Sequence, residues 1–173
     1  MPKFLFSIAL AAMVLAPAAG HSQMMSASAT MYGAGPHGFD GFVGTWSCTN
    51  TTPSSMGGPA HTTLTITRTS VPGVLYYRSV GTGFDNAWYN VYVASKKTWQ
   101  SPFIVSDGSY GTESTMQTGK KIVWVGTAYF ADSGKMMPIR DTNTIGMNKY
   151  NDLGEVRSGG AWKAQYDVSC SRS

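Results

Sequence analysis

Alternation of apolar and polar residues with a period of two runs from Gly41 to the end of the chain, and turn-forming residues interrupt it at short intervals. Successive side chains of a β-strand point to opposite faces, so this alternation is typical of strands that are buried on one side. No segment shows the period of an amphipathic helix. The pattern therefore predicts an all-β domain of antiparallel strands joined by tight turns.

The turn residues divide this part of the chain into nine candidate strands. These span residues 41–50, 62–69, 73–80, 87–94, 98–106, 112–118, 121–130, 138–150 and 160–172. Residues that favour tight hairpin turns lie between these strands, including Asp107-Gly108, Asp132-Ser133-Gly134 and Asn151-Asp152. About nine strands with short connections predict a single antiparallel up-and-down β-barrel, and a two-sheet sandwich is the alternative.

The first and last candidate strands each carry one of the chain's two cysteines, Cys48 and Cys170. One predicted face of the last strand consists of Trp162, Ala164, Tyr166, Val168 and Cys170. Because Cys48 shares a face with Phe42, Gly44 and Trp46, both cysteines are expected to point inward. We predict that they form a disulfide bond that closes the barrel; two buried free thiols are the alternative.

If the cysteines lie opposite each other in an antiparallel pair, Arg172 lies opposite Trp46, because two steps back on one strand match two steps forward on the other. A guanidinium over the indole would contribute roughly 0.5–2 kcal/mol as a cation–π contact. We therefore predict that Trp46 and Arg172 form a barrel-closing pair.

Three short segments give the chain a family resemblance. Gly44-Thr45-Trp46, with a basic residue near the end of the last strand, resembles the G-x-W signature of lipocalins and other calycins. More closely, the chain resembles an uncharacterised group of bacterial lipocalin-like barrel proteins in Gly44-Thr45-Trp46-Ser47-Cys48, Ser106-Asp107-Gly108-Ser109-Tyr110-Gly111 and Tyr129-Phe130-Ala131-Asp132-Ser133-Gly134-Lys135. The resemblance implies a barrel fold and a bacterial source, and it carries no established activity.

The first twenty residues have the layout of a secretory signal peptide. Lys3 precedes an apolar run from Phe4 to Leu15, and small residues follow up to Gly20. That run is shorter than the roughly 20 residues that a membrane-spanning helix needs. We expect cleavage after Ala18 or Gly20, a periplasmic or secreted protein without a membrane anchor, a flexible leader over residues 21–40, and a barrel domain over residues 41–173.

Several function classes lack their sequence signals. The net charge is +4 and the basic residues are scattered, whereas nucleic-acid binding needs a concentrated basic face. The histidines, His21, His37 and His61, have neither metal-ligand spacing nor a G-x-S-x-G nucleophile motif beside them. A nitrobindin-like haem site would need a histidine late in the chain, and none follows His61. We therefore expect no metal and no cofactor, and keep haem binding and hydrolysis as distant alternatives.

Paired carboxylates could still support glycoside hydrolysis if two of them face each other across a cleft. Glu113 and Asp141 are the candidates for such a pair, and surface charges on strands are the alternative.

The aromatic content of the strands favours a ligand cavity, since barrels of eight or more strands can enclose a small molecule. We expect a non-catalytic protein that binds a small apolar or amphipathic molecule; the alternative is a structural or interaction barrel with a filled core. The oligomeric state is left open. The candidate ligand-binding residues are Tyr76, Arg78, Trp88, Glu113, Trp124, Arg140, Trp162 and Tyr166.

Overall fold

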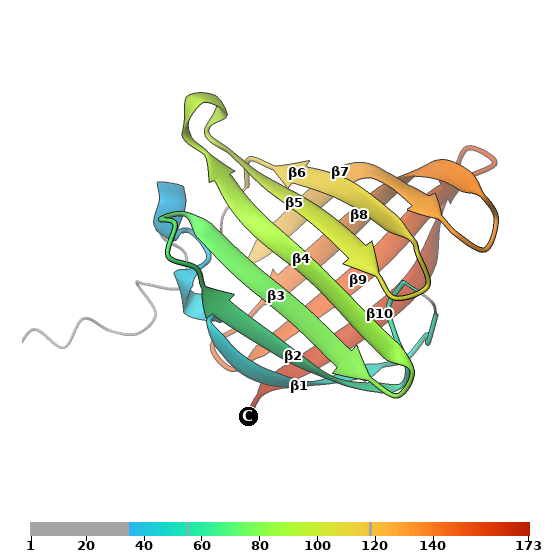
Figure 1. The fold of residues 1–173 in the computed structure, drawn as a ribbon, viewed down its shortest axis with the longest axis horizontal. Helices are drawn as coiled ribbons and strands as arrows, with labels where there is room; N and C mark the ends of the chain where they lie inside the picture. Colours follow the sequence, from blue (N-terminus) through green and yellow to red (C-terminus); the bar gives the residue numbers. More distant parts are fainter. Residues whose placement is uncertain (1–34, 55, 118) are drawn as a thin grey trace, which may run out of the picture.

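The structure is a computed structural model that describes residues 35–54, 56–117 and 119–173. Ten antiparallel strands form a closed barrel in which each strand pairs with its neighbours in sequence and β1 pairs with β10 (Figure 1). Two short 3₁₀ helices, η1 (Gly35–His37) and η2 (Asp40–Phe42), precede the barrel, and η3 (Ala94–Lys96) lies between β4 and β5. The predicted all-β up-and-down barrel is therefore confirmed.

The ten strands are β1 (Gly44–Asn50), β2 (His61–Arg68), β3 (Val74–Gly81), β4 (Phe84–Val93), β5 (Thr98–Val105), β6 (Tyr110–Thr115), β7 (Lys121–Phe130), β8 (Lys135–Ile145), β9 (Lys149–Ser158) and β10 (Ala161–Arg172). Nine strands were expected, and β9 is the additional one. The expected turn at Asn151-Asp152 is wrong, because these residues lie inside β9. The chain reverses earlier, where the Gly146 N–H donates to the Lys149 carbonyl at 2.7 Å.

β9 forms although its Asn, Asp and Gly residues have low intrinsic preference for strands. It pairs on both sides, with β8 and with β10. Gly154 is required at its position, because a Cβ atom there would overlap the ring of Tyr166 on β10. Local propensity is thus overruled by the two flanking strands and by the packing of one tyrosine.

The disulfide bond between Cys48 and Cys170 joins the first and last strands, as predicted. In the same register, Trp46 lies opposite Arg172. Because β1 and β10 pair along five residues, the sheet has no free edge at which another chain could add a strand.

Arg172 covers the buried indole at this end of the barrel. Its Cζ lies 4.6 Å from the centroid of the Trp46 ring, and the Trp46 side chain is fully buried. The guanidinium also donates to the backbone carbonyls of Gly41, at 2.6 Å, and Val43, at 3.2 Å. The arginine therefore ties the end of the last strand to the segment that leads into the first.

The segment before β1 contributes a buried aromatic residue to the core. Phe39 is 2% exposed and packs against Trp99 and Trp124, with ring centroids at 4.6 Å and 5.6 Å. This aromatic side chain closes the end of the barrel where β1 begins. The predicted leader over residues 21–40 lies mostly outside the described residues. The predicted signal peptide lies outside the described residues.

Among the residues that the structure describes, none belongs to a helix long and apolar enough to span a membrane.

Replacing both cysteines, Cys48→Ala with Cys170→Ala, is expected to lower the free energy of unfolding by roughly 2–5 kcal/mol, because the bond restricts the unfolded chain across 122 residues. Urea unfolding followed by tryptophan fluorescence measures the change. Thiol labelling of the unfolded, unreduced parent protein is the control and should find no free cysteine. Coincident unfolding curves for parent and double variant would contradict the prediction.

Arg172→Ala is expected to lower the free energy of unfolding by about 1–2 kcal/mol, because the substitution removes a cation–π contact and two hydrogen bonds. Arg157→Ala, at an exposed arginine near the end of β9, is the matched control and should stay within about 0.5 kcal/mol of the parent. Thermal unfolding by circular dichroism gives both values. Equal losses in the two variants would show that the closing contact contributes nothing specific.

Candidate functional site

The barrel interior has two apolar clusters, and β8 shows that polar residues lie between them. Its inward side chains are, in order, Ile139, Asp141, Asn143 and Ile145. Ile139 belongs to one cluster and Ile145 to the other. The two residues between them place a carboxylate and an amide in the middle of the barrel.

β9 and β5 repeat this order. On β9, Val156 and Tyr150 belong to opposite clusters, and Asp152 lies between them. On β5, Ser101 lies between Trp99 of one cluster and Val105 of the other. We call the polar layer the polar belt; it consists of Asn86, Asn90, Ser101, Glu113, Asp141, Asn143 and Asp152, which all line the same cavity.

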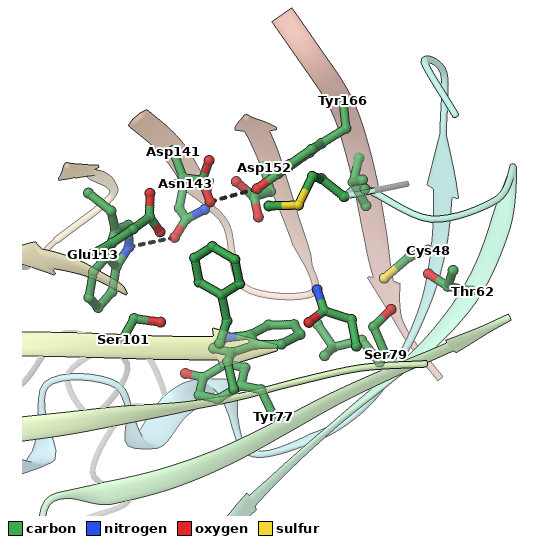
Figure 2. A pocket seen from close by; sticks show the side chains of 18 of the residues that line it. Cys48, Thr62, Tyr77, Ser79, Ser101, Glu113, Asp141, Asn143, Asp152 and Tyr166 are labelled. Atoms are coloured by element: carbon green, nitrogen blue, oxygen red, sulfur yellow. Dashed lines mark hydrogen bonds between the residues drawn. The ribbon is translucent and has the colours of Figure 1, made fainter. Parts of the chain in front are cut away.

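The cavity has a volume of about 120 Å³. Figure 2 shows four belt residues, Glu113, Asp141, Asn143 and Asp152, close to one another in the upper part of the view, with Tyr166 reaching toward them and Ser101 lower down. The remaining wall is largely aromatic, and it includes Tyr77, Phe84, Trp88, Phe103, Trp124 and Phe130. The cavity is therefore apolar over most of its surface and strongly polar on one side.

Hydrogen bonds fix the orientation of the belt residues. The Tyr166 hydroxyl donates to Asp141 Oδ2 at 2.6 Å, and Trp124 Nε1 donates to Asn143 Oδ1 at 2.9 Å. Asp141 also shares a hydrogen bond with Glu113, and Asn143 bonds to Asp152. These contacts form two hydrogen-bonded groups, one of Tyr166, Asp141 and Glu113 and one of Trp124, Asn143 and Asp152.

Burial changes the acid–base properties of the belt. Removal from water raises the pKa of Asp141 to about 6, against the hydrogen bonds from Tyr166 and Glu113, which lower it. Burial also raises the pKa of Glu113 and that of Asp152 well above their ordinary values, and the neighbouring Asp141 adds to both shifts. The described residues that line the cavity include no lysine, arginine or histidine to compensate these carboxylates.

Four acceptor oxygens in the cavity wall have no hydrogen-bond partner. They belong to Asn86, Asn90, Glu113 and Asp152. The remaining groups of these side chains are partly engaged, as in the hydrogen bond between Asn90 and the Tyr77 hydroxyl. An unpartnered buried polar group lowers the free energy of unfolding by roughly 1–3 kcal/mol. A molecule that donates hydrogen bonds to these oxygens would therefore be stabilised in the cavity.

Four of the eight ligand-binding candidates line the cavity, namely Trp88, Glu113, Trp124 and Tyr166. Trp88 stacks on Tyr77, with ring centroids 5.0 Å apart. These four residues come from β4, β6, β7 and β10, so the closed barrel brings together positions that are far apart in the chain.

Tyr76 and Arg78 lie on the outer face instead, which corrects their expected placement. Their strand β3 buries Leu75 and Tyr77, so the residues between point outward. Arg78 pairs with Asp85 through hydrogen bonds of 2.9 Å and 2.6 Å. The sequence around them is apolar on both faces, which left the direction of this strand undetermined.

Arg140 and Trp162 also lie outside the cavity: alternation on β8 turns Arg140 away from the interior, and a β-bulge does so for Trp162. The register between β9 and β10 shifts between Ala164 and Tyr166, so Trp162 faces away from the interior while Tyr166 faces into it. Arg140 Cζ lies 4.5 Å from the Trp162 ring centroid, and its Nε donates to Glu155 at 2.8 Å. A strict period of two cannot reveal an inserted residue.

Sequence reasoning missed most of the polar belt. Asp152 was assigned to a turn, and Asn86, Asn90, Ser101 and Asn143 were not considered. The spacing of Ile139, Asp141, Asn143 and Ile145 is a usable signal, because polar residues occupy the inward positions between two apolar ones.

The site does not match hydrolytic or metal chemistry. The histidines among the described residues, His37 and His61, are exposed, and no metal-binding group of three His, Cys, Asp or Glu occurs in the described part of the chain. Glu113 and Asp141 do face each other, but they share a hydrogen bond. Glycosidase carboxyls stand about 5 Å or more apart to admit a sugar or a water.

No protein-family model matches this chain, and no curated protein matches it either. The fold and the cavity therefore define its class by themselves: a closed, ten-stranded, antiparallel β-barrel with a small internal cavity.

The free energy of unfolding is expected to fall as the pH rises from about 4 to about 7. Asp141 in the folded protein keeps its proton up to about pH 6, whereas the unfolded chain releases it near pH 4. The protonated group therefore stabilises the folded state at low pH, and this contribution to the free energy of unfolding is lost as the pH rises through about 6. The same sign holds for Glu113 and Asp152. Urea midpoints across this pH range measure the slope.

Asp141→Asn should flatten that slope, because an amide still accepts from Tyr166 but does not titrate. Asp132→Asn, at an exposed turn, is the matched control and should keep the slope of the parent. Identical slopes in the parent and in the Asp141 variant would contradict the assignment.

Proposed function

We propose that the barrel binds one small amphipathic molecule in its interior and holds it without chemical turnover. The observation that carries this proposal is the cavity wall, which combines aromatic rings with four unpartnered buried acceptors. A ligand that buries an apolar body against the rings and offers donors to the belt would satisfy both features at once.

The cavity volume sets the size of this molecule. Engineered cavities of about 150 Å³ hold a benzene molecule, whereas pockets for drug-sized ligands begin at roughly 300 Å³. At about 120 Å³, the cavity fits a molecule with a single ring or a short branched chain. Long fatty acids and isoprenoids are too large for it.

Preorganisation supports binding over a purely structural role. Apolar clusters hold the strands together on both sides of the polar belt, and the disulfide bond fixes the closing pair. The belt side chains are therefore oriented before a ligand arrives, which lowers the entropic cost of binding. A structural barrel has no need of buried acceptors without partners.

We further propose that the barrel acts outside the cytoplasm, as its resemblance to lipocalin-like proteins and its signal-like first residues suggest. The disulfide bond between Cys48 and Cys170 is compatible with an oxidising compartment.

Ser101→Leu is expected to abolish binding, because Ser101 is 6% exposed and its enlarged side chain would fill the cavity opposite Glu113. Ser114→Leu on β6, at an outward position, is the matched control and should bind like the parent. A panel of single-ring compounds of each charge is tested by tryptophan fluorescence and by thermal shift.

Native mass spectrometry of the purified protein provides a second readout that needs no choice of compound. A co-purified small mass that is present in the Ser114→Leu variant and lost in the Ser101→Leu variant supports the proposal. If no compound shifts either signal and no mass is retained, the filled-scaffold alternative is favoured.

A further inference from the structure

We propose that the ligand is an organic cation, a primary ammonium group attached to one apolar ring, with its charged end on the polar belt. This inference rests on the proposed function and specifies the chemical class of the ligand.

The first reason is that the unpartnered polar atoms in the cavity wall are oxygens rather than N–H groups. All four unpartnered polar atoms in the cavity wall are oxygens, from two amides and two carboxyl groups. The unpartnered donor of the described residues, Trp99 Nε1, is not part of the cavity lining. The two amide oxygens can only accept hydrogen bonds, and the two carboxyl groups become acceptors alone once they are ionised. An ammonium group offers three donors and no acceptor, which matches the wall in that state, whereas a carboxylate ligand offers only acceptors.

Charge is the second reason. Glu113, Asp141 and Asp152 face one interior, and the described lining residues provide no positive side chain. Arg140, the nearest arginine along β8, is not a lining residue, and it is engaged with Glu155 at 2.7 Å. A cationic ligand would supply the missing opposite charge, while an anion would meet two or three carboxyl groups.

The aromatic wall is the third reason. Trp88, Trp124 and Tyr77 border the same cavity as the belt, and ring faces attract a cation that has been removed from water. The apolar part of the ligand would pack on Phe103 and Phe130, toward the other cluster. The volume of about 120 Å³ restricts the ligand to a compact amine.

Proton release gives a signature that neutral ligands lack. Burial raises the pKa of Glu113 and that of Asp152 well above their ordinary values, and both groups line the cavity. A bound ammonium group favours the ionised carboxylate, so binding of the cation should release protons from the belt.

The test compares three probes of nearly equal shape: benzylamine, benzyl alcohol and benzoate. Isothermal titration calorimetry at pH 7, in buffers of different ionisation enthalpy, measures affinity and proton release together. We expect benzylamine to bind at least tenfold more tightly than benzyl alcohol, with proton release seen for the amine alone. Benzoate should not bind.

Isosteric variants then locate the charge. Asp152→Asn and Glu113→Gln should each lower the affinity for benzylamine by tenfold or more. The affinity for benzyl alcohol should change by less than about twofold in both variants. Asp132→Asn, at an exposed turn, is the matched control and should alter neither. The proton-release measurement on the parent protein stands even if a belt variant fails to fold.

Benzyl alcohol binding as tightly as benzylamine, or amine binding without proton release, would overturn the cation assignment and leave the proposed internal binding intact. Absence of binding by all three probes would also overturn it. The proposal of internal binding is then tested by native mass spectrometry, which compares the small mass retained by the Ser101→Leu variant with that retained by the Ser114→Leu variant.

Discussion

Closure of the sheet between β1 and β10 is the constraint on which the rest of the structure depends. Without it, the ten strands would form an open sheet with two unpaired edges and an interior face exposed to water. The Cys48–Cys170 bond holds this closure covalently, and Arg172 over Trp46 secures the end of the same strand pair. The closed barrel is what removes the belt carboxylates from water.

The polar belt has a cost that the apolar clusters offset. Buried carboxyl groups and unpartnered amides destabilise a folded protein, and a core of leucine and phenylalanine would fill the same space more favourably. The chain instead holds Asp141 and Asn143 in place through Tyr166 and Trp124. This costly polar layer in a fixed geometry is the reason for the binding site that we propose, since unsatisfied groups cluster where function requires them.

The two faces of the barrel share the same strands but differ in chemistry. On the outside, Arg78 pairs with Asp85 where water reaches both partners, and the arginine lowers the pKa of that carboxyl. Inside, Glu113, Asp141 and Asp152 lie close together, and burial raises their pKa values. A carboxyl group therefore has opposite pKa shifts on the two faces of the barrel.

The sequence by itself determined the strand class, the disulfide bond and the Trp46–Arg172 register, because period-two alternation and antiparallel pairing follow from local geometry. Trp88, Glu113, Trp124 and Tyr166 were among its candidates for the interior, and the structure shows that they line the cavity. The tertiary structure alone decided the rest. β9 exists because two neighbours pair with it, and the bulge before Tyr166 turns Trp162 outward. The polar belt exists only once β4 to β10 enclose one space, and no local pattern encodes which distant residues will share it.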